Sequence, residues 1–175
     1  YVVVFLTSSI GFGQESVPDM HAVLVSEPIT VDGELTEKVW QEGGWITDFI
    51  QTFPTDTLPA IGETEVKIAY DDKFLYIAAV MRSPEPRDAY VSTSLRRDYR
   101  GNQNDGISFV IDTFNDKTNG YIFGVNPYGV QREAMVGNGG LQPTDFNLAW
   151  DNKWYSEAVI LEDRWVAEIA IPFST

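Results

Sequence analysis

The sequence has no cysteine, a single histidine and few basic residues. Twelve lysines and arginines stand against 26 aspartates and glutamates among 175 residues, which gives a formal net charge of -14. Without cysteine the chain has no disulfides, no thiol chemistry and no Cys-based zinc or iron–sulfur site. The negative charge repels nucleic-acid phosphates and anionic lipid surfaces, so we expect no nucleic-acid partner, whereas sugars, cations and basic partners suit the chain better.

The sequence also lacks the motifs of common catalytic sites. His21 has no nucleophile near it along the chain, and G-x-S-x-G, H-E-x-x-H and phosphate-binding glycine loops are absent. No two of the 26 acids are singled out as the carboxylate pair that glycoside hydrolysis requires. We therefore expect the chain not to be an enzyme.

Long apolar stretches are confined to the N-terminus. Residues 1–13 are predicted to be a truncated signal peptide, because an apolar run ends in small residues and charge resumes at Glu15; an internal hydrophobic strand is the alternative. Residues 14–21 are interpreted as a linker and residues 22–175 as one folded domain, truncated at its C-terminus. No other segment approaches the roughly 18 apolar residues of a membrane helix, so this domain is expected not to span a membrane.

The remaining chain alternates like β-strands almost throughout. Within residues 64–70, for example, Val66, Ile68 and Tyr70 alternate with Glu65, Lys67 and Ala69. The predicted strands cover residues 22–25, 29–31, 45–51, 63–70, 74–82, 89–95, 106–113, 120–126, 130–136, 154–161 and 164–171. One short helix is predicted over residues 32–40, ended by Gly43 and Gly44. We expect an all-β fold, an antiparallel, jelly-roll-like β-sandwich with one short helix near the N-terminus.

Five sequence blocks occur in an order typical of one family. They are residues 29–35 with Trp40, residues 64–77, 104–112, 124–127 and 165–173. From about residue 27 onward the chain resembles the family 9 carbohydrate-binding modules. The resemblance implies a non-catalytic domain that binds a carbohydrate or another small polar ligand and aids polysaccharide capture or breakdown.

Residues 112–116 and 123–131 are similar to one branch of that family. Its members are exported proteins in which the module precedes a region resembling an outer-membrane β-barrel. The resemblance implies that the chain continues beyond Thr175 and has its own C-terminal barrel region as a partner. It also implies a location in the periplasm, in the outer membrane or at the cell surface of a Gram-negative-type bacterium.

The chain departs from the sugar-binding members at the positions that matter most for binding. Those members clamp a terminal sugar between two tryptophans, but the matching residues 99–105 contain no tryptophan here. Gly124 stands where a polar or charged residue is expected, and the second clamp falls in a segment after Thr175. These departures favour the alternative, an interaction or structural domain of an outer-membrane barrel protein that binds no sugar.

The best predicted sugar platform is the segment 150–154, in which two tryptophans flank three polar residues. Aromatic rings stack on the C–H faces of sugars while polar neighbours bond the hydroxyls, although packing in the core is the alternative for both rings. Trp40 and Trp165 are predicted to be core residues. The candidate carbohydrate-binding residues are Trp150, Trp154, Tyr99, Asn102, Gln103 and Asn126, and turn formation is the alternative for Asn126.

A polar loop precedes the predicted strand 106–113 and is a candidate metal site. Carboxylate and amide oxygens are the ligands that calcium prefers, so calcium is the candidate cofactor; a solvated loop with Arg–Asp pairs is the alternative. The predicted metal ligands are Asp98, Asn104, Asp105 and Asp112. Haem-binding cousins of the sandwich suggest one more alternative, but no motif for haem surrounds Met20, Met81 or Met135.

Overall fold

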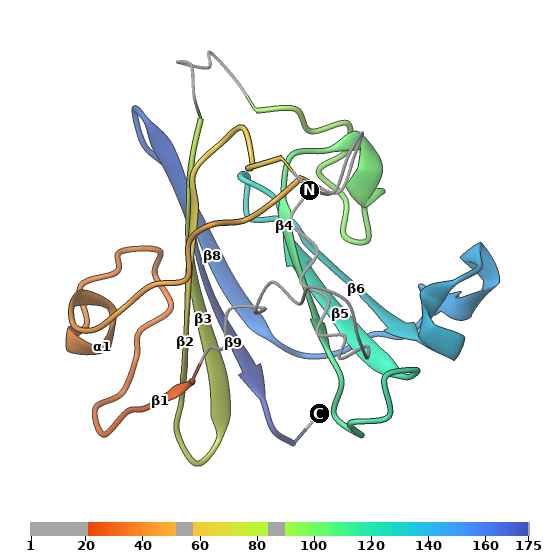
Figure 1. The fold of residues 1–175 in the computed structure, drawn as a ribbon, viewed down its shortest axis with the longest axis horizontal. Helices are drawn as coiled ribbons and strands as arrows, with labels where there is room; N and C mark the ends of the chain where they lie inside the picture. Colours follow the sequence, from red (N-terminus) through yellow and green to blue (C-terminus); the bar gives the residue numbers. More distant parts are fainter. Residues whose placement is uncertain (1–20, 52–57, 84–89, 175) are drawn as a thin grey trace.

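The structure is a computed structural model that describes residues 21–51, 58–83 and 90–174, and these residues form two β-sheets with little helix (Figure 1). The strands are β1 (Val23–Leu24), β2 (Thr64–Tyr70), β3 (Phe74–Arg82), β4 (Ile107–Ile111), β5 (Gly120–Val125), β6 (Gln131–Val136), β7 (Phe146–Asn147), β8 (Tyr155–Ile160) and β9 (Arg164–Pro172). The helical turns are α1 (Lys38–Gln41), η1 (Gly101–Gln103), η2 (Asn138–Gly140) and η3 (Pro143–Asp145). The predicted all-β class is confirmed, and the jelly-roll arrangement stays a prediction.

The two sheets contain different parts of the chain. The larger one has the strand order β1-β2-β3-β9-β8, with β1 parallel to β2 and the other pairs antiparallel. The smaller one has the order β4-β5-β6-β7 and is antiparallel throughout. The predicted signal peptide, residues 1–13, and the linker up to residue 20 lie outside the described residues. Among the described residues, no helix is long and apolar enough to cross a membrane.

Two tight hairpins join strands of the larger sheet, and local hydrogen bonds explain one of them. The Asp71 carboxylate accepts the backbone N–H groups of Lys73 and Phe74, both at 2.7 Å, which closes the turn between β2 and β3. These contacts and the Tyr76 hydroxyl outweigh the effect of desolvation, which alone would raise the pKa of Asp71, and so they lower it. The second hairpin joins β8 to β9, where Ile160 pairs with Trp165.

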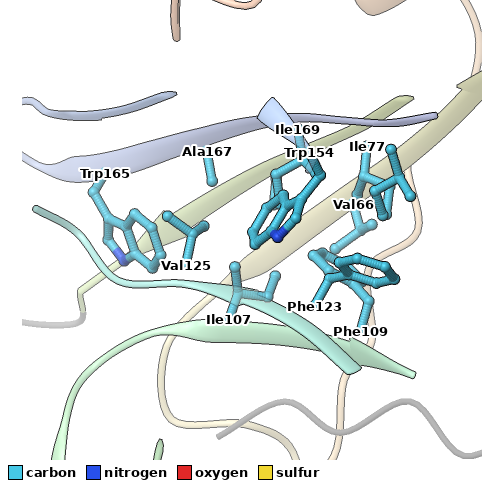
Figure 2. Packing of buried hydrophobic residues seen from close by; sticks show 12 residues of the cluster. Val66, Ile77, Ile107, Phe109, Phe123, Val125, Trp154, Trp165, Ala167 and Ile169 are labelled. Atoms are coloured by element: carbon cyan, nitrogen blue, oxygen red, sulfur yellow. The ribbon is translucent and has the colours of Figure 1, made fainter. Parts of the chain in front are cut away.

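The main core lies between the two sheets (Figure 2). Its side chains come from alternate positions of β2, β3 and β9 on one side and of β4 and β5 on the other, as the period of two predicts. Trp165, predicted as a core residue, is 3% exposed. Trp154 also lies here, with its ring 5.4 Å from that of Phe123 in an edge-to-face arrangement. The alternating patterns of the sequence therefore build one shared interior.

The N-terminal segment covers the other face of the larger sheet. Trp40 is 2% exposed and packs there with Ala69, Tyr76, Ala78 and Ala170, which confirms its prediction as a core residue. Glu168, the one acid inside β9, holds this segment in place. Its carboxylate accepts the Trp40 indole N–H at 2.8 Å and the backbone N–H groups of Asp32 and Gly33 at 3.0 and 3.1 Å. Desolvation raises the pKa of Glu168, although these three donors act against the rise.

The predicted helix over residues 32–40 is wrong over residues 32–37, and the contacts of Glu168 explain the difference. Gly33 has a φ of +78°, which a right-handed helix does not allow, and its N–H points to Glu168 instead of joining a helical turn. A Cβ at this position would lie 2.6 Å from Cγ2 of Val159, so glycine also lets the backbone approach β8. The α-helix accordingly contains only Lys38–Gln41.

Three predicted strands do not form in the described residues. Residues 29–31 pack Ile29 and Val31 against the outer face of the larger sheet, so their alternation reflects packing and not strand pairing. Residues 45–51 make only isolated bridges at Ile46 and Ile50. In the segment predicted as the strand 89–95, residues 90–95 form a loop, and residue 89 lies outside the described residues.

Candidate functional site

A short segment wraps around the edge of the smaller sheet; we call residues 96–100 the strap. Asp98 accepts the backbone N–H of Glu133 on a side-chain oxygen at 3.2 Å, and its own N–H donates to the carbonyl of Gln131 at 3.0 Å. The strap is thereby fixed to the backbone of β6 at the start of that strand. Its residues next to Asp98 then project to opposite faces of the sheet.

On the core-facing side, Arg97 meets a buried glutamate. Its Nε donates to Oε1 of Glu133 at 3.1 Å, and Nη2 forms a closer salt bridge with the same oxygen. Glu133 is 1% exposed, and its other oxygen accepts the indole N–H of Trp154 at 3.0 Å. Arg97 also donates to the side chain of Gln131 at 2.6 Å and to the carbonyl of Asn152 at 2.9 Å. These contacts lock the strap to β6 and to the connection before β8.

On the opposite face, Tyr99 lies against Arg132. The guanidinium carbon is 5.8 Å from the centroid of the Tyr99 ring, which is a cation–π arrangement. Tyr99 is only 5% exposed, so its ring supports Arg132 from below and does not itself offer an open platform. The strap thus supplies the floor of a site on the outer face of the smaller sheet.

Arg132 belongs to a row of three paired residues across this face: Ser108 of β4 pairs with Gly124 of β5, which pairs with Arg132 of β6. A Cβ at Gly124 would lie 2.5 Å from Oγ of Ser108 and 3.0 Å from Cγ of Arg132, so no larger side chain fits between them. We call Ser108, Gly124 and Arg132 the Arg132 row. Arg132 places a charged group on the same face where the family pattern predicted one at position 124.

The loop that leads to β4 is held by its own polar side chains. Asn104 accepts the N–H of Thr93 at 2.6 Å and donates to the carbonyl of Arg100 at 2.6 Å. Asp105 accepts the N–H of Val91 at 2.8 Å. Because these groups are engaged within the loop, they shape it and leave the neighbouring η1 turn to face solvent.

The predicted sugar-binding residues fall in two separate places. Tyr99, Asn102 and Gln103 lie on the strap and on η1, and the last two are exposed. Asn126 is fully buried: its side-chain oxygen accepts the N–H groups of Tyr128 and Val130 at 3.0 and 2.9 Å. Asn126 therefore closes the turn between β5 and β6, which agrees with the alternative of turn formation. A ligand role for Asn126 stays a prediction.

The two predicted platform tryptophans lie on the core side of the smaller sheet. Trp154 is 4% exposed, and Trp150 is half-buried with its ring 4.8 Å from that of Tyr121. All five tryptophans of the chain are among the described residues, and all are buried or half-buried. Their positions match the packing alternative for this segment, while a sugar contact by Trp150 or Trp154 stays a prediction.

The four predicted metal ligands are not brought together at one point. Asp112 follows the last residue of β4 and Asp105 precedes the strand, so a span of about 20 Å of extended chain separates them. The oxygens of Asp112 accept the backbone N–H groups of Phe114, Asp116 and Lys117 in a loop of their own. No group of three or more acidic, histidine or cysteine side chains in the described part of the chain is arranged to hold a metal ion. Calcium binding by Asp98, Asn104 and Asp105 stays a prediction.

A concave region lies where the edge strand β8 of the larger sheet approaches the start of β6. It is a shallow hollow of about 390 Å³. Its lining includes Ile29, Phe74 and Tyr155, together with Gln131, which directly precedes Arg132, and Trp154, one of the predicted sugar-binding residues. Tyr155 is 46% exposed there, and its ring stands edge-on to Phe74 at 6.1 Å. In this hollow an exposed aromatic ring and polar groups face solvent together.

Comparison with known proteins identifies the fold. No protein-family model matches the sequence, and no curated protein matches it. Two solved structures of a family 9 carbohydrate-binding module from Caldicellulosiruptor kristjanssonii, one in complex with cellotriose and one with glucose, superpose with a TM-score of 0.60. Each covers 90% of this chain at 19% identity, and the match spans 69% and 70% of their chains. The chain has the fold of these modules.

The sequence interpretation missed the residues that organise the site. Arg132, Ser108, Arg97 and Glu133 were not among its candidates, although each lies on a correctly predicted strand or loop. The available signal was charge at a strand position: Glu133 sits where the alternation of β6 points to the core, and such an acid needs buried donors. Glu168 in β9 carries the same signal.

Proposed function

We propose that this chain is a non-catalytic carbohydrate-binding module whose ligand lies on the outer face of the smaller sheet, over the Arg132 row and beside the strap. The fold similarity to modules solved with cellotriose and with glucose supports a sugar ligand. One observation favours this face: a half-buried arginine and a half-buried serine stand side by side over a buried glycine, so that two hydrogen-bonding groups lie close together. A few placed polar groups of this kind suit the hydroxyls of a sugar ring.

The exposed side chains of Asn102 and Gln103 extend the same face. They belong to η1, which follows the strap directly, and amide groups both donate and accept hydrogen bonds. Polar side chains around a shallow apolar floor are the usual composition of a sugar site. They are therefore assigned, together with Arg132 and Ser108, to contacts with the ligand.

The test is calorimetric titration with cellotriose, glucose and a panel of soluble polysaccharides. Arg132→Ala is expected to weaken binding at least tenfold, whereas Arg164→Ala is expected to leave it unchanged. Arg164 is a matched control, because it too is a half-buried strand arginine but lies on the larger sheet beside Asp163. If Arg132→Ala binds sugar as tightly as the wild type, the ligand does not bind over the Arg132 row.

The alternative function is an interaction or structural domain that binds no sugar. The observation favouring it is that none of the five tryptophans offers an exposed ring. Silence toward the whole glycan panel from a chain with a cooperative thermal transition would establish this alternative. Attachment to a C-terminal outer-membrane barrel, export to the cell envelope and a role in polysaccharide capture belong to the same proposal and rest on the sequence resemblance.

A further inference from the structure

The Arg132 guanidinium differs from the other half-buried arginines of the described chain. Arg82 forms a salt bridge with Glu65 across β2 and β3, and Arg164 forms one with Asp163 at 2.7 Å. The Arg132 side chain is likewise half-buried, yet no described residue gives its guanidinium a salt bridge or a hydrogen bond, and the guanidinium lies instead over the Tyr99 ring. A partly desolvated cation without a counter-ion is costly, so a ligand that brings an anion gains from it.

The surroundings of Arg132 are basic although the chain is strongly acidic. The strap contributes three further arginines, Arg96, Arg97 and Arg100, so that four of the twelve basic residues of the chain are gathered around one short segment and one strand. The salt bridge to Glu133 neutralises Arg97, while Arg96 and Arg100 are exposed. At physiological salt the Debye length is about 8 Å, so the net charge of -14 acts weakly here and the nearby arginines decide which anion approaches.

The shape of the face sets the geometry of the ligand. The side chains of Ser108 and Arg132 lie next to each other over the buried Gly124, so a ligand that reaches Arg132 also approaches the Ser108 hydroxyl. A guanidinium fork matches a carboxylate with two parallel hydrogen bonds, and a ring hydroxyl next to that carboxylate would lie toward Ser108.

From these contacts we propose that the preferred ligand is an acidic sugar, a uronic acid unit whose carboxylate pairs with Arg132. The inference rests on the proposed function and names the ligand class of that same site. The strap provides the floor through Tyr99, and Arg96 and Arg100 strengthen the local positive potential. Neutral sugars are expected to bind the same face more weakly.

The experiment compares an oligogalacturonide with its fully methyl-esterified form, which has the same rings and linkages but no charge. The acid is expected to bind the wild-type chain at least tenfold more tightly than the ester. Raising sodium chloride from 20 to 300 mM is expected to weaken acid binding several-fold and to leave ester binding unchanged. In Arg132→Gln the preference for the acid is expected to disappear, while Arg164→Gln keeps it.

Each other outcome is decisive. Equal affinity for acid and ester overturns the assignment of an acidic ligand and leaves the proposed function standing. Binding of neither form, nor of cellotriose, overturns the proposed function itself. Tighter binding of a sulfated oligosaccharide than of the uronate overturns the assignment of a carboxylate as the anionic group of the ligand. Retained preference in Arg132→Gln, with a melting temperature like that of the wild type, overturns the role of this arginine.

Discussion

Each of the two sheets contains one buried glutamate, and the two glutamates accept hydrogen bonds from different parts of the chain. Glu168 of the larger sheet and Glu133 of the smaller sheet each accept a tryptophan indole N–H, from Trp40 and Trp154 respectively. Glu168 takes its remaining hydrogen bonds from the backbone of the N-terminal segment, whereas Glu133 takes them from the Arg97 guanidinium and from the backbone N–H of Asn152. One carboxylate fastens a covering segment, and the other orients a strap that carries the candidate site.

The comparison teaches that similar buried acids serve separate purposes. The donors to Glu168 are two backbone N–H groups and an indole N–H, so loss of its carboxylate affects packing on one face of the larger sheet. The Glu133 cluster contains the strap, and the strap determines where Tyr99 lies beneath Arg132. Stability and ligand binding should therefore respond differently to mutation of the two residues.

The largest expected effect belongs to Glu168→Ala. Two buried donors, the N–H of Gly33 and the indole N–H of Trp40, and the part-buried N–H of Asp32 lose their acceptor. We expect the free energy of unfolding to fall by about 4 kcal/mol, as measured by urea denaturation. Glu157→Ala is the control, because Glu157 pairs with Glu168 across β8 and β9 but is exposed. That control should change stability by less than about 0.5 kcal/mol. A loss below 1 kcal/mol for Glu168→Ala would show that its contacts are not maintained in solution.

Glu133→Gln should be next in size and should separate the two clusters. We expect a loss of about 3 kcal/mol, because a charged acceptor of Arg97 and Trp154 is replaced by an amide with one donor group facing them. Sugar affinity should also fall several-fold, since the strap is no longer fixed.

The matched comparison for this loss of affinity is Glu168→Gln, which should destabilise the fold without changing the affinity of the folded fraction. Calorimetric titration well below the melting temperature of each variant measures the sugar affinity of Glu133→Gln and of Glu168→Gln. Equal effects of the two substitutions on affinity would contradict the separate roles.

Gly33→Ala tests the close approach of the N-terminal segment to β8. The substitution places a methyl group against Val159 at a φ of +78°, and we expect a loss of about 2 kcal/mol. Gly129→Ala has a similar φ of +75° but no atom within 4 Å of the new Cβ, so it should cost about 1 kcal/mol. If the two variants melt alike, the contact with Val159 contributes nothing.

The smallest effect is the pH dependence of Glu168. Because its pKa is raised in the folded protein, the folded state keeps a proton that the unfolded state has lost. This stabilising contribution is present below the ordinary pKa of 4.5 and is lost as the pH rises through the folded pKa. The stability difference between the wild type and Glu168→Gln should therefore shrink as the pH rises through that interval, in denaturation curves at matched ionic strength. A stability difference that grows as the pH rises would show that folding lowers the pKa of Glu168, contrary to this account.

The sequence predicted the strands better than the segments around them. Period-two alternation located β2 to β6, β8 and β9 within one or two residues, because each buries one face against the partner sheet. The same alternation misled at residues 29–31, since Ile29 and Val31 pack on a sheet face without joining it. Pattern alone does not separate a covering segment from a strand.

The candidate site was predicted only in part, for a physical reason. Tyr99, Asn102 and Gln103 lie beside the site that we propose, but Arg132 and Ser108 acquire their role through register, by pairing with Gly124 from two different strands. Register between distant strands is set by tertiary packing and is not written in either strand alone. The sequence suggested Trp150 and Trp154 as rings for stacking on a sugar, whereas in the structure the buried indole N–H of Trp154 donates to Glu133.

The most direct test of the account is a map of the ligand site in solution. A ¹⁵N-labelled chain titrated with a uronate oligosaccharide should show chemical-shift changes in the strap, in η1, at Ser108 and Gly124, and at the Nε–H of Arg132. Residues 29–31 and Tyr155, which line the hollow on its larger-sheet side, should stay unshifted and serve as the internal control. Shifts confined to that hollow, or no shifts anywhere at millimolar ligand, would contradict the placement of the binding face on the smaller sheet.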